Sequence, residues 1–185
     1  MTPRFPVVAA AAAIALLRSA TAHASLVGLW ADEDMELRPQ LQLDGGLSIL
    51  GLAFEYPITG PYAVAVGGGV MSTYFAPWFD AGDRVDGFCG EVRITRFTRT
   101  DGRGLYVAPF LRVGRVTGER DDAEGDGWGL STAALVGWTF GLGERFDLRV
   151  GGGFQYFHYV VETAAGDVDV TTPFVAIDAV LGFRL

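Results

Sequence analysis

Charged side chains set at alternate positions in apolar segments are the residues of this sequence that could do chemistry. In the stretch at 145–159, RFDLRVGGGFQYFHY, Asp147 and Arg149 share one parity, whereas Phe146 and Leu148 share the other. A period of two is typical of a β-strand, whose successive side chains point to opposite faces. Carboxylates and guanidinium groups on one face can pair with each other or line a conduction path.

Eight segments with this period could position such side chains. Turn pairs occur at Thr59-Gly60, Asp101-Gly102 and Gly143-Glu144, and longer polar stretches lie between them at 76–86, 117–126 and 162–170. Asp44-Gly45-Gly46 reads as one further, short loop. We expect strands at 35–43, 47–58, 61–75, 87–98, 104–116, 127–140, 145–160 and 171–185. Strands joined alternately by tight turns and longer loops predict an all-β, eight-stranded antiparallel up-and-down β-barrel.

The composition of the two faces favours a transmembrane β-barrel. One face is apolar, and the other is mostly Gly, Ala and Ser with a few charges, which suits the crowded interior of a narrow barrel. Aromatic residues of the apolar face cluster near the strand ends, as in the two girdles of a bilayer protein. They are Tyr56, Tyr62, Trp138, Phe140, Phe146 and Phe183 toward the tight turns, and Tyr74, Trp128 and Tyr156 toward the loops.

A secreted lipocalin-like barrel or a β-sandwich is the alternative architecture. Such proteins also have about eight strands, but an apolar face this long would leave a large hydrophobic patch in water. We therefore favour the membrane barrel.

The first residues predict export. An apolar run at 7–17, VVAAAAAIALL, is followed by Ala22-His23-Ala24, the small-x-small form that signal peptidase accepts. Eleven apolar residues are too few to span a bilayer as a helix, which needs about 20. We expect residues 1–24 to be a cleaved signal peptide and residues 25–185 to form one barrel domain.

Charge and cysteine content exclude other classes. The net charge of −8 argues against a nucleic-acid partner, because phosphate binding needs a basic surface. The single cysteine, Cys89, cannot form an internal disulfide, so the chain is not a disulfide-stapled module. Its place on the small-residue face indicates packing.

Three runs of the mature chain resemble a known group of proteins. These are residues 35–70, residues 104–115 (GLYVAPFLRVGR) and the final VAIDAVLGFRL, and they are similar to small outer-membrane β-barrel proteins of Gram-negative bacteria, of the OmpA-like or OmpX-like single-domain kind. The resemblance implies an outer-membrane location after cleavage near Ala24 and a monomer. It also implies contact with outer-membrane lipid, lipopolysaccharide and the assembly machinery. Such barrels typically end in an aromatic residue, whereas this chain ends in Leu185 with Phe183 two positions earlier.

The inward-facing charges predict an ionic plug. Five acidic residues, Glu36, Glu55, Glu91, Asp147 and Asp178, share the inner face with five arginines, Arg38, Arg93, Arg112, Arg149 and Arg184. Buried charges must be paired, and an eight-stranded barrel is narrow enough to be filled by its own side chains. We expect Glu91 to lie directly opposite Arg112, and Asp147 directly opposite Arg184. Arg38, Arg93, Arg149 and Asp178 are expected to link these two pairs into one network.

Other candidate sites have simpler interpretations. Asp122, Glu124 and Asp126 match the first half of a calcium loop, but the twelfth position is Ala133, which supplies no carboxylate. His158 is the one histidine after residue 24, and no serine follows it. The repeated VGGG at 66–69 and 150–153 does not precede a phosphate-binding lysine. We therefore expect no catalytic, cofactor-binding or metal-ligating residues, and no enzyme.

Two functions remain open at this point. The first is a barrel with a closed, charge-plugged interior and a structural or surface-interaction role carried by its extracellular loops. The alternative is a small transport barrel that passes hydrophobic solutes across the outer membrane. A lipid-modifying enzyme is disfavoured because His158 has no partner serine.

Overall fold

The computed structural model describes residues 36–47, 49–72 and 84–185. The expected signal peptide at 1–24, residue Tyr74 and most of the expected loop at 76–86 lie outside these residues, so what was expected of them stays a prediction. The described part of the chain contains no helix that is both long and apolar enough to cross a membrane.

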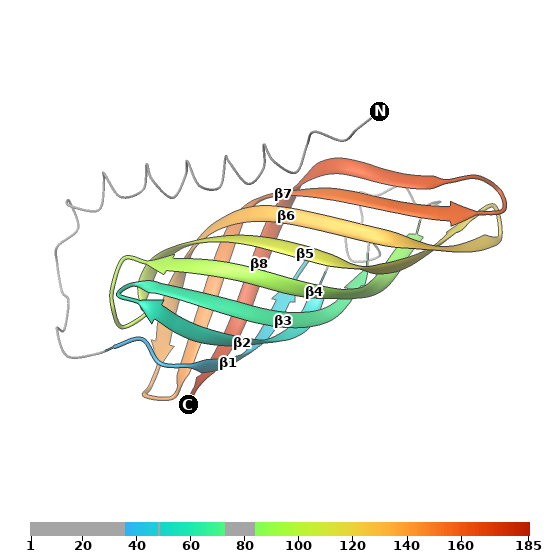
Figure 1. The fold of residues 1–185 in the computed structure, drawn as a ribbon. Helices are drawn as coiled ribbons and strands as arrows, with labels where there is room; N and C mark the ends of the chain where they lie inside the picture. Colours follow the sequence, from blue (N-terminus) through green and yellow to red (C-terminus); the bar gives the residue numbers. More distant parts are fainter. Residues whose placement is uncertain (1–35, 48, 73–83) are drawn as a thin grey trace. The chain divides into compact units, whose positions relative to one another are not determined.

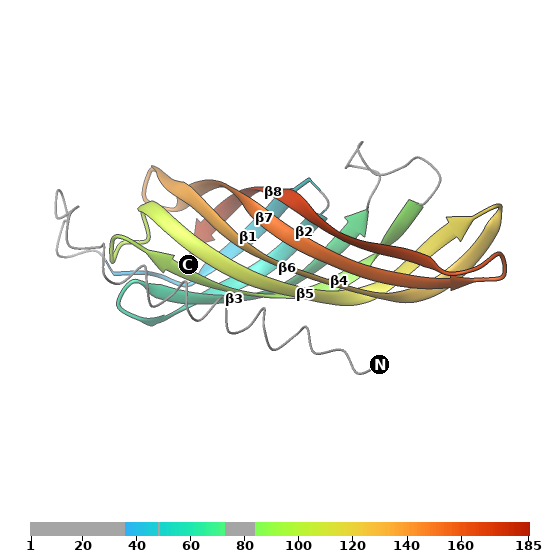
Figure 2. The same ribbon diagram turned by 90° about the horizontal axis from the view of Figure 1, so that it is seen from above.

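Eight antiparallel strands form one closed ring in chain order (Figures 1 and 2). Each strand pairs with its two neighbours in sequence, and β1 closes the ring by pairing with β8. The predicted all-β, up-and-down, eight-stranded barrel is therefore confirmed. The strands are β1 (Gln40–Gly46), β2 (Ile49–Thr59), β3 (Tyr62–Ser72), β4 (Arg84–Phe97), β5 (Gly104–Arg120), β6 (Ala123–Leu142), β7 (Phe146–Thr163) and β8 (Val168–Arg184).

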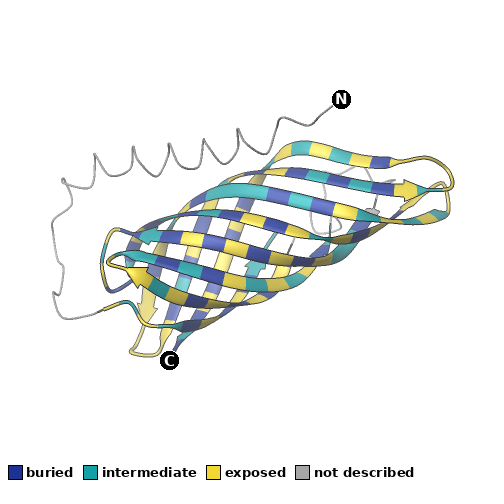
Figure 3. Ribbon diagram, in the orientation of Figure 1, coloured by how far each residue is buried: buried dark blue, intermediate teal, exposed yellow. Residues whose placement is uncertain are grey.

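Burial alternates from residue to residue along the strands, as Figure 3 shows. In β2, for example, Ala53 and Glu55 are buried in the barrel, whereas Leu52 and Phe54 are exposed on its outer surface. The alternation follows from the pleat of a strand, which sends neighbouring side chains to opposite faces. As predicted, charged and small residues face the interior and apolar residues face outward, but the interior also holds large apolar side chains such as Phe97, Leu135 and Phe157.

The first strand starts later than expected. β1 begins at Gln40, because Pro39 has no N–H to donate to a β-ladder. Asp44 and Gly45, expected in a loop, instead pair with Gly51 and Leu50 of β2 and belong to β1.

The polar segment at 117–126 is a hairpin tip and not a long loop. β5 and β6 continue pairing up to Arg120↔Ala123, so Asp121 and Asp122 are left as a two-residue turn. Both have positive φ angles, 48° and 63°, which is the geometry of the tight hairpin turns that aspartate tolerates. The loop expected at 162–170 is likewise short, because β7 ends at Thr163 and β8 starts at Val168.

The barrel wall is therefore uneven in height. β5, β6, β7 and β8 have 17 to 20 residues, whereas β1, β2 and β3 have 7 to 11. Pairing between β1 and β8 ends at Gly46↔Asp178, so β8 extends ten residues beyond β1 on the side of the longer connections.

Two glycines on the inner face of the barrel leave room for a tyrosine side chain to pack over them. Gly137 of β6 and Gly151 of β7 are register partners, and Tyr106 of β5 is the register partner of Gly137. A Cβ atom at either glycine would overlap the Tyr106 hydroxyl, because the tyrosine lies over both backbones. Tyr106 is buried there and packs against Phe97, with ring centroids 6.4 Å apart.

Substitution of Gly151, which faces inward, should destabilise the barrel. Substitution of its outward-facing neighbour Gly152 should have little effect. Gly151→Val places a Cβ atom against the Tyr106 hydroxyl, so Tyr106 must move, and overpacking of this kind costs about 1–3 kcal/mol. Gly152→Val is the matched control, because Gly152 is exposed and its nearest neighbour would be at an ordinary 3.6 Å. Urea unfolding of the refolded variants, followed by tryptophan fluorescence, measures both. Equal stability of the two variants would contradict this packing.

Candidate functional site

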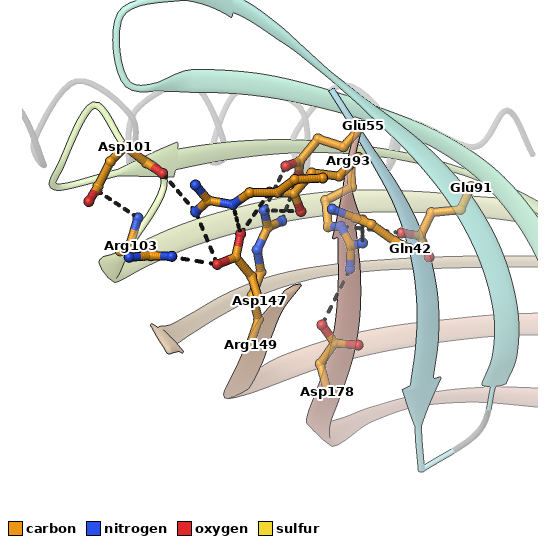
Figure 4. A network of polar contacts seen from close by, with 11 residues as sticks. Gln42, Glu55, Glu91, Arg93, Asp101, Arg103, Asp147, Arg149 and Asp178 are labelled. Carbon is orange, nitrogen blue, oxygen red and sulfur yellow. Dashed lines mark hydrogen bonds and ion pairs between the residues drawn. The ribbon is translucent and has the colours of Figure 1, made fainter. Parts of the chain in front are cut away.

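A network of buried carboxylates, arginines and amides fills the middle of the barrel and its tight-turn end (Figure 4). The alternating strands aim every second side chain into the ring, so residues far apart in sequence meet across the lumen. The buried charged members are Asp44, Glu55, Glu91, Arg93, Asp101, Arg112, Asp147, Arg149, Asp178 and Arg184.

Glu91 and Arg112 form the first predicted pair. They are direct register partners on β4 and β5, and Arg112 Nε lies 2.5 Å from Glu91 Oε2. The Arg112 guanidinium also stacks 4.0 Å from the centre of the Phe110 ring. The expected direct opposition and the expected ion pair are both confirmed.

Asp147 and Arg184 form the second predicted pair, but not in the expected register. Arg184 Nε and Nη2 donate to the two oxygens of Asp147 at 2.5 and 3.0 Å, a bidentate contact. The direct partner of Asp147 on β8 is Gly182, so Arg184 reaches Asp147 diagonally from two residues along the strand. The register differs from the prediction because the turn is centred earlier. The Thr163 carbonyl accepts from Gly166 N at 3.1 Å, and Gly166 has a φ of 119°.

Arg149 finds its partner across the lumen. Its Nη1 and Nη2 donate to the two oxygens of Glu55 at 2.7 and 2.6 Å, joining β7 to β2. The guanidinium carbon lies 4.8 Å from the centre of the Phe97 ring. Arg149 Nη2 also donates to Gln40, whose amide in turn donates to Asp147 at 2.9 Å. The Arg149 and Arg184 pairs are therefore connected, as expected, although through Gln40.

Arg93 joins two further strands, β1 and β8, at the centre of the network. Its Nη1 donates to Asp44 Oδ2 at 2.9 Å and to Asp178 Oδ2 at 3.3 Å. Its Nη2 donates to Gln42 at 2.7 Å, and its Nε lies 3.6 Å from Glu91 Oε1. One arginine from β4 thus ties β1 to β8 and reaches the Glu91–Arg112 pair, which confirms Arg93 and Asp178 as members.

Arg38 does not belong to the network, contrary to the prediction. It is exposed, it precedes β1, and no ion pair joins it to the described residues. Residues 36–39 form an irregular segment that ends at Pro39, so the alternation that places Gln40 inside does not extend back to Arg38. Glu36, counted with the inward charges, is exposed for the same reason.

Three members were missed or misplaced by sequence reasoning. Asp44 was assigned to a loop, although it shares the parity of Gln40 and Gln42 and could have been found by extending their strand. Asp101 sits in a tight turn yet is buried, and its carbonyl accepts from Arg184 Nη2 at 3.1 Å. Arg103 Nε lies 3.6 Å from Asp147. No local pattern indicates that this turn folds over the end of the barrel.

Two small cavities border the network among the described residues. Each measures about 10 Å³, roughly the room that one water needs. A cluster of buried apolar side chains, including Val116, Phe157 and Val161, occupies the interior toward the hairpin tips. Cys89 is buried in that cluster, as its expected packing role requires.

The other candidate residues lie on the outer surface. His158 is half-buried, its Nδ1 lies 2.8 Å from Thr171 Oγ1, and its ring meets Trp128 edge-on at 5.1 Å. Asp122 lies in the hairpin turn, and Glu124 and Asp126 are exposed on the β6 strand that follows it. Within residues 36–47, 49–72 and 84–185, no group of three or more histidine, cysteine or acidic side chains is placed to hold a metal ion.

Removing one carboxylate of a complete pair should destabilise the barrel strongly. Asp147→Asn leaves Arg184 buried without its bidentate partner, and a buried charge stripped of its partner costs about 3–5 kcal/mol. Glu162→Gln, on the exposed outer face of the same strand, is the control and should change stability little. The free energy of unfolding in urea is the measurement, and a small effect of Asp147→Asn would show that the pair does not hold the interior together.

Comparison with known proteins adds no assignment. No protein-family model matches the chain, and a search of the curated proteins finds no match. The interior network and the outer surface are therefore interpreted from their own geometry.

Proposed function

We propose that the protein is an integral barrel of the Gram-negative outer membrane, with a closed, charge-plugged interior and a structural or surface-interaction role. The observation that carries the proposal is a reversal of polarity along the long strands. On β5, the outward residues Leu111 and Val113 are followed by Arg115, Thr117 and Glu119. A strand that leaves a bilayer passes from lipid into water, so the residues on its outer face change from apolar to polar.

At the same level along the strands, the inner face changes from charged to apolar residues. On β5, the inward Arg112 is followed by the inward Val116. On β7, Asp147 and Arg149 are followed by Phe157, Tyr159 and Val161. Toward the hairpin tips the wall is thus polar outside and apolar inside, like a soluble protein. Below that point the outer face is apolar and the inner face carries the charged network beside the buried Phe97, Phe110 and Leu135, which supports lipid as the outer solvent there.

The outward apolar side chains would be costly in water. Leu52, Phe88 and Phe154 are 69, 74 and 75% exposed, and each has an exposed apolar register partner on one neighbouring strand, Leu43, Val70 and Val175 respectively. Keeping one large apolar side chain in water forgoes about 1.5–3 kcal/mol relative to burial. A continuous band of them is far larger than the apolar patches that soluble monomers expose.

The aromatic residues are placed where a bilayer has its two interfaces. Tyr56, Trp138, Phe140 and Phe146 are exposed toward the tight turns, and Trp128 and Tyr156 are exposed where the outer face turns polar. A tilted strand crosses a bilayer in about 9–11 residues, so the long β5–β6 and β7–β8 hairpins would extend outside it. We assign these hairpins to the cell exterior, because barrels of this kind keep their short turns in the periplasm.

The filled interior favours the structural or surface-interaction role over transport. Passing a hydrophobic solute needs a continuous path, whereas the bordering cavities hold about 10 Å³ each and four arginines cross or line the lumen. Transport thus remains the weaker alternative, and we propose no catalytic activity. Expected contacts are outer-membrane lipid, lipopolysaccharide and the assembly machinery, with the protein as a monomer.

Fractionation tests the location. The mature protein should appear in the outer-membrane fraction and should migrate differently on gels when it is not heated, because a closed barrel resists unfolding by detergent. A periplasmic protein of similar size in the same host serves as the fractionation control. Recovery in the periplasm without detergent would contradict the membrane proposal.

Planar bilayer recordings test the closed interior. The purified barrel should give no stable single-channel currents, since the Arg93, Arg149 and Arg184 pairs block the lumen. A variant that empties the plug, Arg93→Ala combined with Arg149→Ala, is the positive control, provided that it still inserts. Stable currents from the unaltered protein would favour the transport alternative.

A further inference from the structure

The centre of the network holds more acidic groups than basic ones. Asp44, Glu91 and Asp178 are buried there, and only Arg93 and Arg112 among the buried arginines contact them. The other arginines are engaged elsewhere in the described barrel. Arg149 pairs with Glu55 and Arg184 with Asp147, while Arg99 and Arg103 are partly exposed near the turn. Three carboxyl groups thus share two guanidinium groups.

Asp44 and Asp178 are the two carboxyl groups that do not each have a guanidinium partner. Arg112 is bound to Glu91, so these two aspartates share the single Nη1 of Arg93. No donor among the described residues reaches Asp44 Oδ1 or Asp178 Oδ1, although both atoms are buried. The two carboxyl groups are neighbours, because their Oδ2 atoms lie 2.9 and 3.3 Å from the same Arg93 Nη1 atom. Two ionised carboxylates cannot hydrogen-bond, because neither has a proton to donate.

A proton is the neutralising species that fits this space. Two carboxylates that share a buried site cannot both remain ionised without a large electrostatic cost, and one of them then retains its proton. The bordering cavities of about 10 Å³ have room for roughly one water, which is too little for a hydrated cation. The described residues also contain no cluster of three or more metal-ligating side chains.

We propose that the folded barrel binds one proton between Asp44 and Asp178. This proton forms a hydrogen bond between the two carboxyl groups and so stabilises the pairing of β1 with β8. Asp178 pairs in register with Gly46, so Asp44 lies two residues away on the adjacent strand. A shared proton turns a repulsion between these two strands into a hydrogen bond. The charged or titratable groups next to the two carboxyls are Glu91 and Arg93 of β4 and Arg112 and Tyr106 of β5. Two further groups act indirectly, Glu55 through Arg93 and Arg149 through Tyr106.

The proposal predicts that stability falls as pH rises. An aspartate of the unfolded chain ionises near pH 4, so above about pH 5 unfolding releases the bound proton. The unfolding equilibrium constant should then rise by up to about tenfold per pH unit, until the folded site itself loses the proton. The inference concerns the interior alone, so it stands or falls independently of the outer-membrane proposal.

Asparagine variants test the shared proton. Asn has the shape of a protonated aspartate and no charge, so Asp178→Asn should retain wild-type stability at about pH 6 and exceed it at about pH 9. Asp44→Asn should behave in the same way. The double variant should be destabilised, because Arg93 would keep only the more distant Glu91. Asp147→Asn, at a fully paired carboxylate, is the matched control and should be destabilised at both pH values.

Urea unfolding of the full mature chain, refolded in detergent micelles, supplies these data. Loss of stability in both single variants, as large as in Asp147→Asn, would overturn the proposal, as would a wild-type pH dependence identical to that of Asp178→Asn. Dependence on sodium, measured by replacing it with choline, would assign the neutralising charge to a cation instead. If a variant does not fold, infrared difference spectra of the wild type decide the question. A protonated carboxyl band must be present at about pH 6 and absent in denaturant at the same pH.

Discussion

The charged interior of this barrel depends on the pairing of arginine with carboxylate within a narrow ring of strands. A ring of eight strands is narrow, so side chains from opposite walls touch. A buried charge without a partner costs several kcal/mol, which makes each pair a constraint on the distance between strands. Arg149 with Glu55, and Arg93 with Asp44 and Asp178, join strands that are not neighbours in the ring. These contacts therefore tie opposite walls of the barrel together, in addition to the hydrogen bonds between neighbouring strands.

The outer wall and the inner plug arise from one sequence pattern. Because a strand alternates strictly, each apolar residue that faces outward commits its two neighbours to the interior. Small residues such as Gly137 and Gly151 leave room for the Tyr106 side chain on the inner face of the wall. Long residues such as Arg93 extend across the lumen. A substitution that shifts the register by one residue would therefore exchange the plug with the wall along the whole strand.

How much of this could be predicted depends on how local each feature is. The strand period and the turn at Asp101-Gly102 are local, so the eight strands and the opposition of Glu91 and Arg112 followed from the sequence. The opposition of Asp147 and Arg184 was misjudged by two residues, because side-chain and backbone bonds of Thr163 set the turn centre. The pairs across the lumen depend on ring closure, and no sequence window contains both partners.

The height of the polarity reversal explains why the interior has two layers. Where apolar side chains occupy the outward positions, the inward positions carry the buried charges, which need partners, and Phe97, Phe110 and Leu135 are packed beside them. Toward the hairpin tips the outer face carries Arg115, Thr117 and Glu119, so the apolar residues Val116 and Val161 are free to fill the inside as in any water-soluble sheet. The ionic layer and the apolar layer thus follow from the solvent outside each part of the wall. In the ionic layer each buried charge needs a partner, and among the described residues two carboxyl groups share one guanidinium where β1 meets β8.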